Sequence, residues 1–314
     1  MKVSIFKPRT DSRRWYTALD WDKVNGKLFP YYLLAPSLII IFGLTIYPIF
    51  YSFGVSLLNY NLLIPGKSFA GLGNYMRLFM DSEFWASLGR TLYFAMVSIA
   101  VQITLGMIVA LVLDQRFVGR GWTRAIVLLP WGVPTIVNGI LWKWIYQPNY
   151  GALNGLLYQL GFIKQYMQWL SDPWLAMHMI IIADTWKVLG FYVVLFLASL
   201  QSIPSDIYES ARVDGASPIR QFIHITLPML RPTFLLILVM RTLETFRVFD
   251  IIYALTQGGP ANGTKVIGYM AYEETFRFLD FGRGAAVSIV ITLLVAAFSL
   301  LYIRMFFDRD VQFS

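Results

Sequence analysis

The chain has 314 residues, of which 57% are hydrophobic and 14% charged, whereas a soluble domain carries about 25% charged residues. The apolar residues form long blocks, which indicates that lipid surrounds the fold. The net charge is +8, but the basic residues form no stripe interleaved with aromatic residues, and this argues against nucleic-acid binding. The absence of cysteine excludes disulfides, and the isolated His178 and His224 are too few for a zinc site.

The first 30 residues form a polar stretch with seven Lys or Arg, which predicts a cytoplasmic N-terminal tail over 1–30 and no cleavable signal. Residues 31–306 hold six apolar segments, each long enough for the roughly 20 residues of a transmembrane helix. The six predicted spans are 33–57, 90–113, 123–146, 175–200, 233–256 and 284–306. Residues 307–314 would form a C-terminal tail. The sequence therefore predicts an all-α integral membrane protein with six transmembrane helices.

The distribution of basic residues predicts the orientation of these spans. With a cytoplasmic N-terminus, fifteen Lys or Arg fall on the inner side and six on the outer side. The positive-inside rule then places both termini in the cytoplasm. Prolines interrupt the first span at Pro36 and Pro48 and the third at Pro130 and Pro134, either as ordinary kinks or as broken helices around a central path.

The loop between the fourth and fifth spans, residues 201–232, has an unusually well-defined turn pattern. Pro204 and Ser205 predict a helix start, and Gly215 suits a left-handed residue at the end of that helix. Pro228 and Pro232 then limit a second helix before the fifth span. The loop therefore predicts helix, sharp turn and helix on the cytoplasmic side.

This loop resembles the EAA loop of permease subunits in binding-protein-dependent ABC importers. The pattern Glu-x-Ala-x-x-x-Gly, nine residues and Ile-x-Leu-Pro is matched from Glu209 to Pro228, with Ser210 as a small replacement in the triplet. Three further segments resemble the carbohydrate-uptake branch, in particular the first permease of maltose, lactose and glycerol-phosphate importers: Asp214–Ala216, Phe246–Pro260 and Phe69–Tyr75. The resemblance covers roughly 31–306 and implies a type I ABC importer permease.

The resemblance also implies how the chain works with other proteins. The loop would form a coupling helix in a cleft of a cytoplasmic ATPase, through Glu209, Ser210, Ala211, Asp214, Gly215 and Ala216. The chain itself would hold no cofactor, since ATP and Mg²⁺ would bind to the partner ATPase dimer. A second permease subunit, an extracytoplasmic solute-binding protein and the lipid of a bacterial inner membrane would complete the assembly. Glu209 could instead only cap or solubilise its helix.

Charged residues within predicted spans are costly and favour a functional interpretation. On the fourth span, Asp184, Lys187 and Phe191 share one helix face. On the fifth, Arg241, Glu244, Thr245 and Val248 do the same. Such polar groups beside aromatic rings suit a sugar site.

The resemblance to the maltose permease places its substrate-lining positions on eight residues of this chain: Asp184, Lys187, Val188, Phe191, Arg241, Glu244, Thr245 and Val248. The alternative is that Asp184–Lys187 and Arg241–Glu244 are interhelical ion pairs holding the bundle. Arg247 and Asp250 look like a gate or an anchoring pair near the outer end.

Two other classes of protein share some of these features. An ion-coupled secondary transporter or channel would explain the intramembrane charges but not the EAA loop. A membrane enzyme would need clustered catalytic carboxylates or metal ligands at one membrane face, and the sequence shows none. We therefore expect a non-enzymatic permease subunit that imports a sugar or a related polyhydroxylated solute.

Overall fold

The computed structural model describes residues 29–306, so the predicted tails at 1–28 and 307–314 lie outside the described residues. The described chain is helical apart from a two-stranded hairpin, β1 (Leu58–Asn59) and β2 (Ser68–Phe69). The helices are α1 (Phe29–Ile41), η1 (Phe42–Ile46), α2 (Tyr47–Ser56), α3 (Gly73–Met80), α4 (Ser82–Asp114), α5 (Arg120–Leu128), η2 (Leu129–Gly132), α6 (Thr135–Ile145), α7 (Ala152–Gln159), α8 (Pro173–Gln201), α9 (Ser205–Val213), α10 (Pro218–Gln221), η3 (Phe222–Thr226), α11 (Leu227–Met229), α12 (Arg231–Phe246), α13 (Asp250–Leu255), α14 (Ile267–Tyr272), η4 (Glu273–Arg277) and α15 (Phe281–Phe306).

Four helical segments among the described residues are long and apolar enough to cross a membrane: Pro30–Ser56, Ser82–Asp114, Pro173–Gln201 and Phe281–Met305. Two bent pairs raise the count to six if each is one span. The predicted all-helical membrane architecture is therefore confirmed.

The third and fifth predicted spans are not continuous helices. The third is interrupted at Leu129–Pro134, where α5 and η2 meet α6 at an angle of 100°. The fifth, predicted over 233–256, ends as α12 at Phe246, and a separate helix α13 begins at Asp250. α12 is itself bent by 59° from the segment Pro218–Met229. Pro130 and Pro134 thus mark a broken helix rather than a mild kink.

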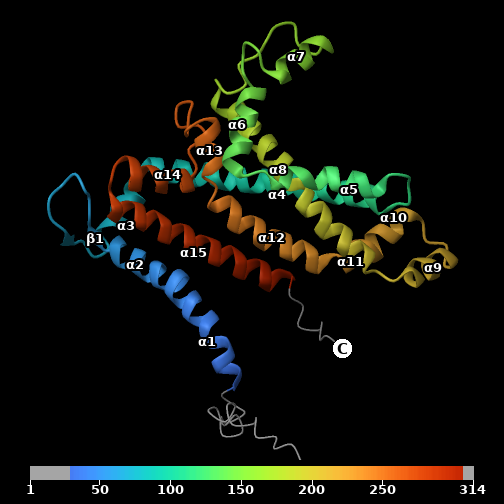
Figure 1. Ribbon diagram of the computed structural model, residues 1–314, viewed down its shortest axis with the longest axis horizontal. Coiled ribbons are helices and arrows are strands. Elements are labelled where there is room, and N and C mark those ends of the chain that lie inside the picture. Colours follow the sequence, from blue (N-terminus) through green and yellow to red (C-terminus); the bar gives the residue numbers. More distant parts are fainter. Residues whose placement is uncertain (1–28, 307–314) are drawn as a thin grey trace, which may run out of the picture. The chain divides into compact units, whose positions relative to one another are not determined.

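The chain divides into two compact units, Met1–Ser52 and Phe53–Ser314. In the first, α1, η1 and the start of α2 follow one another as continuous helix. In the second, α8 is the central helix and packs along α4, with α5, η2, α6, α12 and α13 also against it (Figure 1). Buried aromatic and aliphatic side chains such as Phe94, Ile180 and Phe196 fill these contacts.

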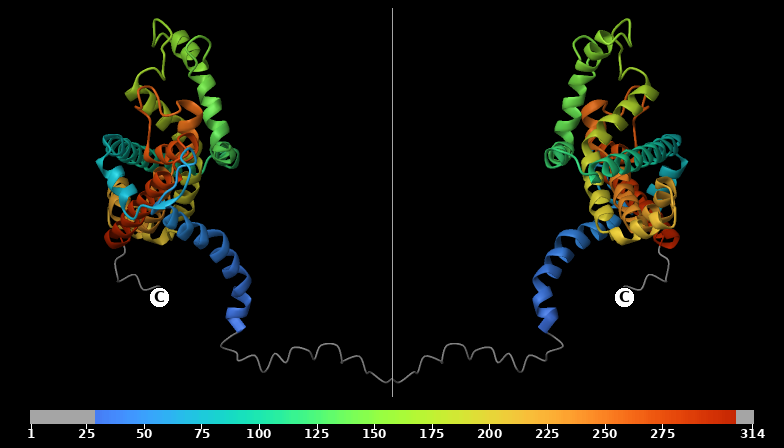
Figure 2. Two further views of the ribbon diagram at one scale, coloured as in Figure 1. Left: turned by 90° about the vertical axis from the view of Figure 1, so that its left-hand side faces the viewer. Right: turned by 90° about the vertical axis from the view of Figure 1, so that its right-hand side faces the viewer.

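Two glycines allow the broken segments to lie close to their neighbours. A Cβ atom at Gly190 of α8 would overlap the carbonyl oxygen of Val127, so the absence of a side chain lets the end of α5 rest directly on α8. A Cβ atom at Gly139 would overlap the side chain of Ala254, which brings α6 against α13. From that contact α6 leads away from α5 and carries α7 beyond the helices around α8 (Figure 2).

The end of the second unit that holds α3, α14 and η4 is tied together by ion pairs. Lys265 Nζ lies 2.6 Å from Glu273 Oε2, and both residues are largely buried. Arg283 Nε lies 3.1 Å from Glu274 Oε1, and its Nη2 contacts Asp81. These pairs connect α15 to the start of α4 and so fix the helix ends around the central bundle.

Candidate functional site: a charged cavity and an exposed helical loop

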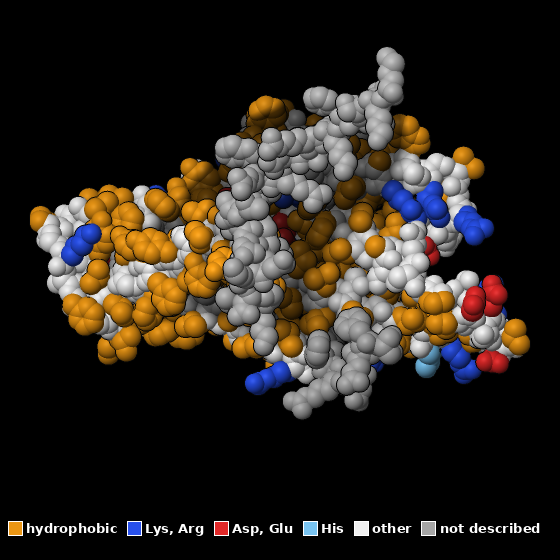
Figure 3. All heavy atoms as spheres, turned by 60° about the horizontal axis from the view of Figure 1, so that its bottom comes forward, with side chains coloured by type: hydrophobic (Ala, Val, Ile, Leu, Met, Phe, Trp, Pro, Cys, Tyr) orange, Lys and Arg blue, Asp and Glu red, His pale blue; other side chains and the backbone are white. Residues whose placement is uncertain are grey.

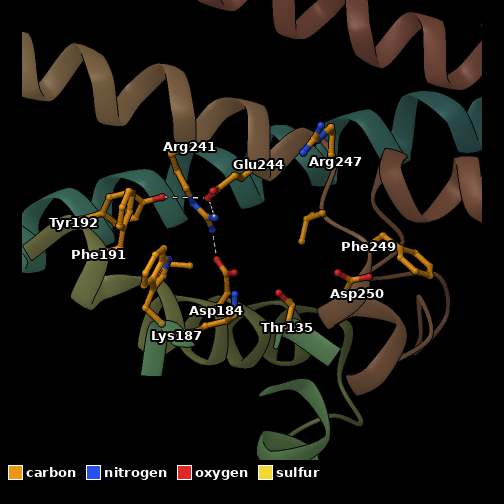
Figure 4. A pocket seen from close by; sticks show the side chains of 13 residues that line it. Thr135, Asp184, Lys187, Phe191, Tyr192, Arg241, Glu244, Arg247, Phe249 and Asp250 are labelled. Carbon is orange, nitrogen blue, oxygen red and sulfur yellow. Dashed lines mark hydrogen bonds and ion pairs between the residues drawn. The ribbon is translucent and has the colours of Figure 1, made fainter. Parts of the chain in front are cut away.

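A cavity of about 270 Å³ lies among α8, η2, α6, α12 and the segment that joins α12 to α13 (Figure 4). Its charged lining consists of three acids and three bases, so the lining has no net formal charge. These residues are Asp184, Glu244, Asp250, Lys187, Arg241 and Arg247. Trp131, Thr135, Val188, Phe191, Tyr192, Val248 and Phe249 complete it.

Arg241 is the centre of the charged lining. Its guanidinium is buried and contacts Asp184 of α8 through Nη2, while Nη1 lies 3.1 Å from Glu244 Oε2. Tyr192 donates its hydroxyl to the same oxygen of Glu244 at 3.3 Å. A planar guanidinium can hold two carboxylates at once because its donors form a rigid fork. The ion pair between α8 and α12 is therefore Asp184–Arg241.

One wall of the cavity is aromatic. The rings of Trp131 and Phe191 stack with centroids 5.1 Å apart and an interplanar angle of 13°. Gly190 creates this pair, because it lets the broken segment that carries Trp131 approach α8 beside Phe191. The cavity thus combines an aromatic surface with hydrogen-bonding groups, the usual composition of a small-molecule site.

The structure brings together seven of the eight predicted path residues. Thr245 is the exception: it does not line the cavity, and its buried hydroxyl donates to the backbone carbonyls of Arg241 and Thr242. Such back-bonding to the preceding turn is common for threonine in a helix.

The alternative interpretation, in which ion pairs between helices hold the bundle, applies to Asp184, but its partner is Arg241 rather than Lys187. Arg241 bridges to Asp184 across helices, while Arg241–Glu244 lies within α12. In residues 29–306, Lys187 forms no ion pair with Asp184, and Arg247 forms none with Asp250. Arg247 and Asp250 instead both line the cavity.

Sequence reasoning missed several lining residues, namely Trp131, Thr135, Tyr192 and Phe249. Pro130 and Pro134 flank Trp131 and indicate a possible break in the span, but they do not indicate that the Trp131 ring faces a cavity. Tyr192 follows Phe191 directly and reaches back to Glu244 across the helix pair. Phe249 belongs to the non-helical joint after α12, which hydropathy does not reveal.

The predicted helix–turn–helix after α8 is present. α9 ends in a Schellman motif: the Ala216 amide donates to the Ala211 carbonyl and the Gly215 amide to the Arg212 carbonyl. Gly215 has φ of +77°, as this motif requires. The Tyr208 hydroxyl and Thr226 Oγ1 lie 2.8 Å apart, so α9 is fastened to η3.

The loop presents an exposed surface around Glu209. Glu209, Ser210, Asp214 and Gly215 are exposed, and so are the apolar side chains of Ile207, Val213 and Ile219. Figure 3 shows hydrophobic side chains over much of one face, with charged ones gathered toward the end where α9 and α10 lie. Within residues 29–306 Glu209 has no side-chain hydrogen bond or ion pair, so it does not cap α9.

A helical membrane fold with broken spans around a polar cavity, and with an exposed helical loop, is the architecture expected of a membrane transport subunit. The family model described as "Binding-protein-dependent transport system inner membrane component" matches residues 102–312, and the chain belongs to this family. It is therefore a multi-pass inner membrane protein and a permease subunit of an ABC importer, not an enzyme. The family assignment decides against an ion-coupled transporter or channel.

Individual proteins that are similar to this chain are permease subunits as well. The chain is 42% identical to the "Trehalose/maltose transport system permease protein MalF" of Thermococcus litoralis, over 89% of this chain and 94% of the relative. It is 35% identical to the "Trehalose transport system permease protein SugA" of Mycobacterium tuberculosis, over 87% of each. A chain of a solved bacterial ABC transporter for alginate import has the same fold, with a TM-score of 0.79 and 23% identity over 93% of this chain and 99% of the other.

Proposed function

We propose that the chain carries a neutral sugar, of the trehalose or maltose class, across the cytoplasmic membrane. The observation that carries this proposal is the lining of the cavity: its formal charges cancel and a stacked aromatic pair forms one wall. A neutral polyhydroxylated solute suits fixed donors and acceptors beside an apolar ring surface. The names of the relatives, which include trehalose and maltose, support the same class.

In this proposal the cavity is this subunit's share of the translocation path. Asp184, Lys187, Val188, Phe191, Arg241, Glu244 and Val248 would line it, and Thr245 would support the backbone of α12 from behind. The path would lie at the broken spans, where backbone polar groups can be tolerated because they face a polar cavity rather than lipid.

Transport would be driven through the exposed loop 201–232. Its Schellman turn and the Tyr208–Thr226 contact make α9 a stiff projection from the bundle. Glu209, Ser210, Ala211, Asp214, Gly215 and Ala216 would contact an ATPase subunit that binds ATP and Mg²⁺. Closure of the ATPase dimer would then shift the two states of the permease through this rigid contact.

The proposed assembly has a second permease subunit, an ATPase dimer and an extracytoplasmic solute-binding protein. Residues 1–30 and 307–314 would be cytoplasmic tails of the permease domain 31–306, in keeping with the excess of basic residues on that side. In one solved relative, an alginate ABC transporter is in complex with a "pentasaccharide-bound periplasmic protein".

Uptake of labelled trehalose and maltose into vesicles tests the proposal. Glu244→Ala and Asp184→Ala should lower uptake at least ten-fold, with unchanged sugar affinity of the binding protein. Lys143→Ala is the control, because Lys143 is exposed on α6 and does not line the cavity. Normal uptake in both cavity variants would mean that the cavity is not the path.

A further inference from the structure

Gln102 of α4 is a buried polar side chain that lies behind the cavity and does not line it. Its Nε2 atom lies 3.1 Å from Asp184 Oδ2 and 3.3 Å from Thr185 Oγ1. A carboxylate only accepts hydrogen bonds, so the amide nitrogen of Gln102 must face Asp184. In the interior, such a bond to a charged group is stronger than a neutral one.

Asp184 connects Gln102 to the charged residues of the cavity. Its Oδ2 atom accepts from Gln102 and from Nη2 of Arg241, so residues of α4 and α12 hold the same carboxylate oxygen. Arg241 in turn places Nη1 on Glu244. A continuous chain of polar contacts therefore runs from Gln102 on α4, through Asp184 on α8, to Arg241 and Glu244 on α12.

The members of this chain differ sharply in exposure. The side chains of Asp184 and Arg241 are 6% and 4% exposed, whereas the Glu244 side chain is 47% exposed. Both Tyr192 and Arg241 contact the same oxygen of Glu244, Oε2. The other oxygen, Oε1, has no hydrogen-bond partner among residues 29–306 and is available to accept from a solute hydroxyl.

We propose that Gln102 is a positioning residue for the transport site: by fixing Asp184 and Arg241 it holds Glu244 in place to receive a hydroxyl of the solute. This inference rests on the proposed function of the cavity. It divides the charges into a buried anchor, Asp184 and Arg241, and a solute-facing acceptor, Glu244.

The test compares Gln102→Leu with Ser98→Ala in the complete importer in proteoliposomes, at saturating sugar-loaded binding protein. Gln102→Leu keeps the size of the side chain and removes the donor. Ser98 is buried one turn earlier on α4, and its hydroxyl has no partner among the described residues, so Ser98→Ala is a matched control. Complex yield and basal ATPase activity report assembly separately.

Gln102→Leu should reduce sugar uptake about ten-fold, the effect of losing one hydrogen bond to a charged group. Ser98→Ala should transport as the parent protein does. The combination of Gln102→Leu with Glu244→Gln should be no worse than Glu244→Gln alone, because residues that act as one unit are not additive. Gln102→Glu, which opposes Asp184 with a like charge, should be at least as impaired as Gln102→Leu.

Three results would overturn the inference: parental uptake in an assembled Gln102→Leu complex, equal losses in Gln102→Leu and Ser98→Ala, or losses that multiply in the double variant. If Glu244→Gln itself transports normally while Gln102→Leu does not, the proposed path fails and Gln102 has only a structural role. The two failures are thus distinguishable.

Discussion

Replacing Gly190 by alanine should disturb both the packing of α8 and the aromatic wall of the cavity. The new methyl group would overlap the Val127 carbonyl oxygen and lie 2.9 Å from Leu128 Cα. These are backbone atoms, so no side-chain rotation relieves the overlap and the end of α5 must move. Extra methyl groups in a packed interior cost about 1–3 kcal/mol, and the displaced segment carries Trp131 away from Phe191.

Gly89→Ala supplies the control for this prediction. Gly89 also lies in a long helix, and a Cβ atom there meets nothing within 4 Å. Both substitutions gain the higher helix propensity of alanine, up to about 1 kcal/mol. The difference between the two variants therefore isolates the steric cost of about 1–3 kcal/mol. Melting of the detergent-purified importer at one heating rate, together with sugar uptake, measures it.

The expected outcome is a lower melting temperature and reduced uptake for Gly190→Ala, with Gly89→Ala matching or exceeding the parent protein. If the two variants melt at the same temperature and transport equally well, then α5 does not rest on Gly190 and the account of the aromatic wall is wrong.

Three further substitutions test the loops. Glu209→Lys should abolish binding-protein-stimulated ATP hydrolysis and uptake while leaving the permease folded, as judged by its melting; unimpaired uptake would contradict the coupling role. Gly215→Ala forces a side chain into a left-handed conformation at φ +77° and should destabilise the end of α9 by about 1–2 kcal/mol, measured as faster amide exchange over 205–213. Asn154→Ala removes hydrogen bonds to Met167 and Trp169 and should speed amide exchange over 151–169, since buried partners left unpaired cost about 1–3 kcal/mol each. Unchanged exchange in either variant would refute its local argument.

The apolar runs and the loop motif are the features that sequence reasoning read correctly. Transmembrane helices need long apolar segments and satisfy their backbone internally, so hydropathy locates them with little competition. The loop 203–228 was equally readable, because a left-handed glycine and flanking prolines dictate a turn locally. Both features depend on near neighbours in the chain.

The side-chain contacts inside the site were harder to predict from the sequence, because they join segments that are distant in the chain. Gln102 and Asp184 are 82 residues apart, and nothing near Gln102 in the sequence indicates its partner. Asp184 and Lys187 share a helix face and both line the cavity, but the ion-pair partner of Asp184 is Arg241, 57 residues away, rather than Lys187. Helical periodicity predicts which side chains share a face; the partner across the helix interface depends on how the helices pack.

The third and fifth predicted spans, which are broken in the structure, contribute all of the cavity lining that does not come from α8. A continuous third span would leave no η2 turn to carry Trp131, and a continuous fifth span would keep Arg247–Asp250 in helical register. Each break frees backbone polar groups that lipid could not satisfy, so it must face protein or a polar cavity. The charged lining supplies that environment, while Gly190 and Gly139 let the broken ends lie directly against α8 and α13. Departures from regular helix and intramembrane charges therefore depend on each other, because each supplies polar groups that the other needs in a membrane-spanning fold.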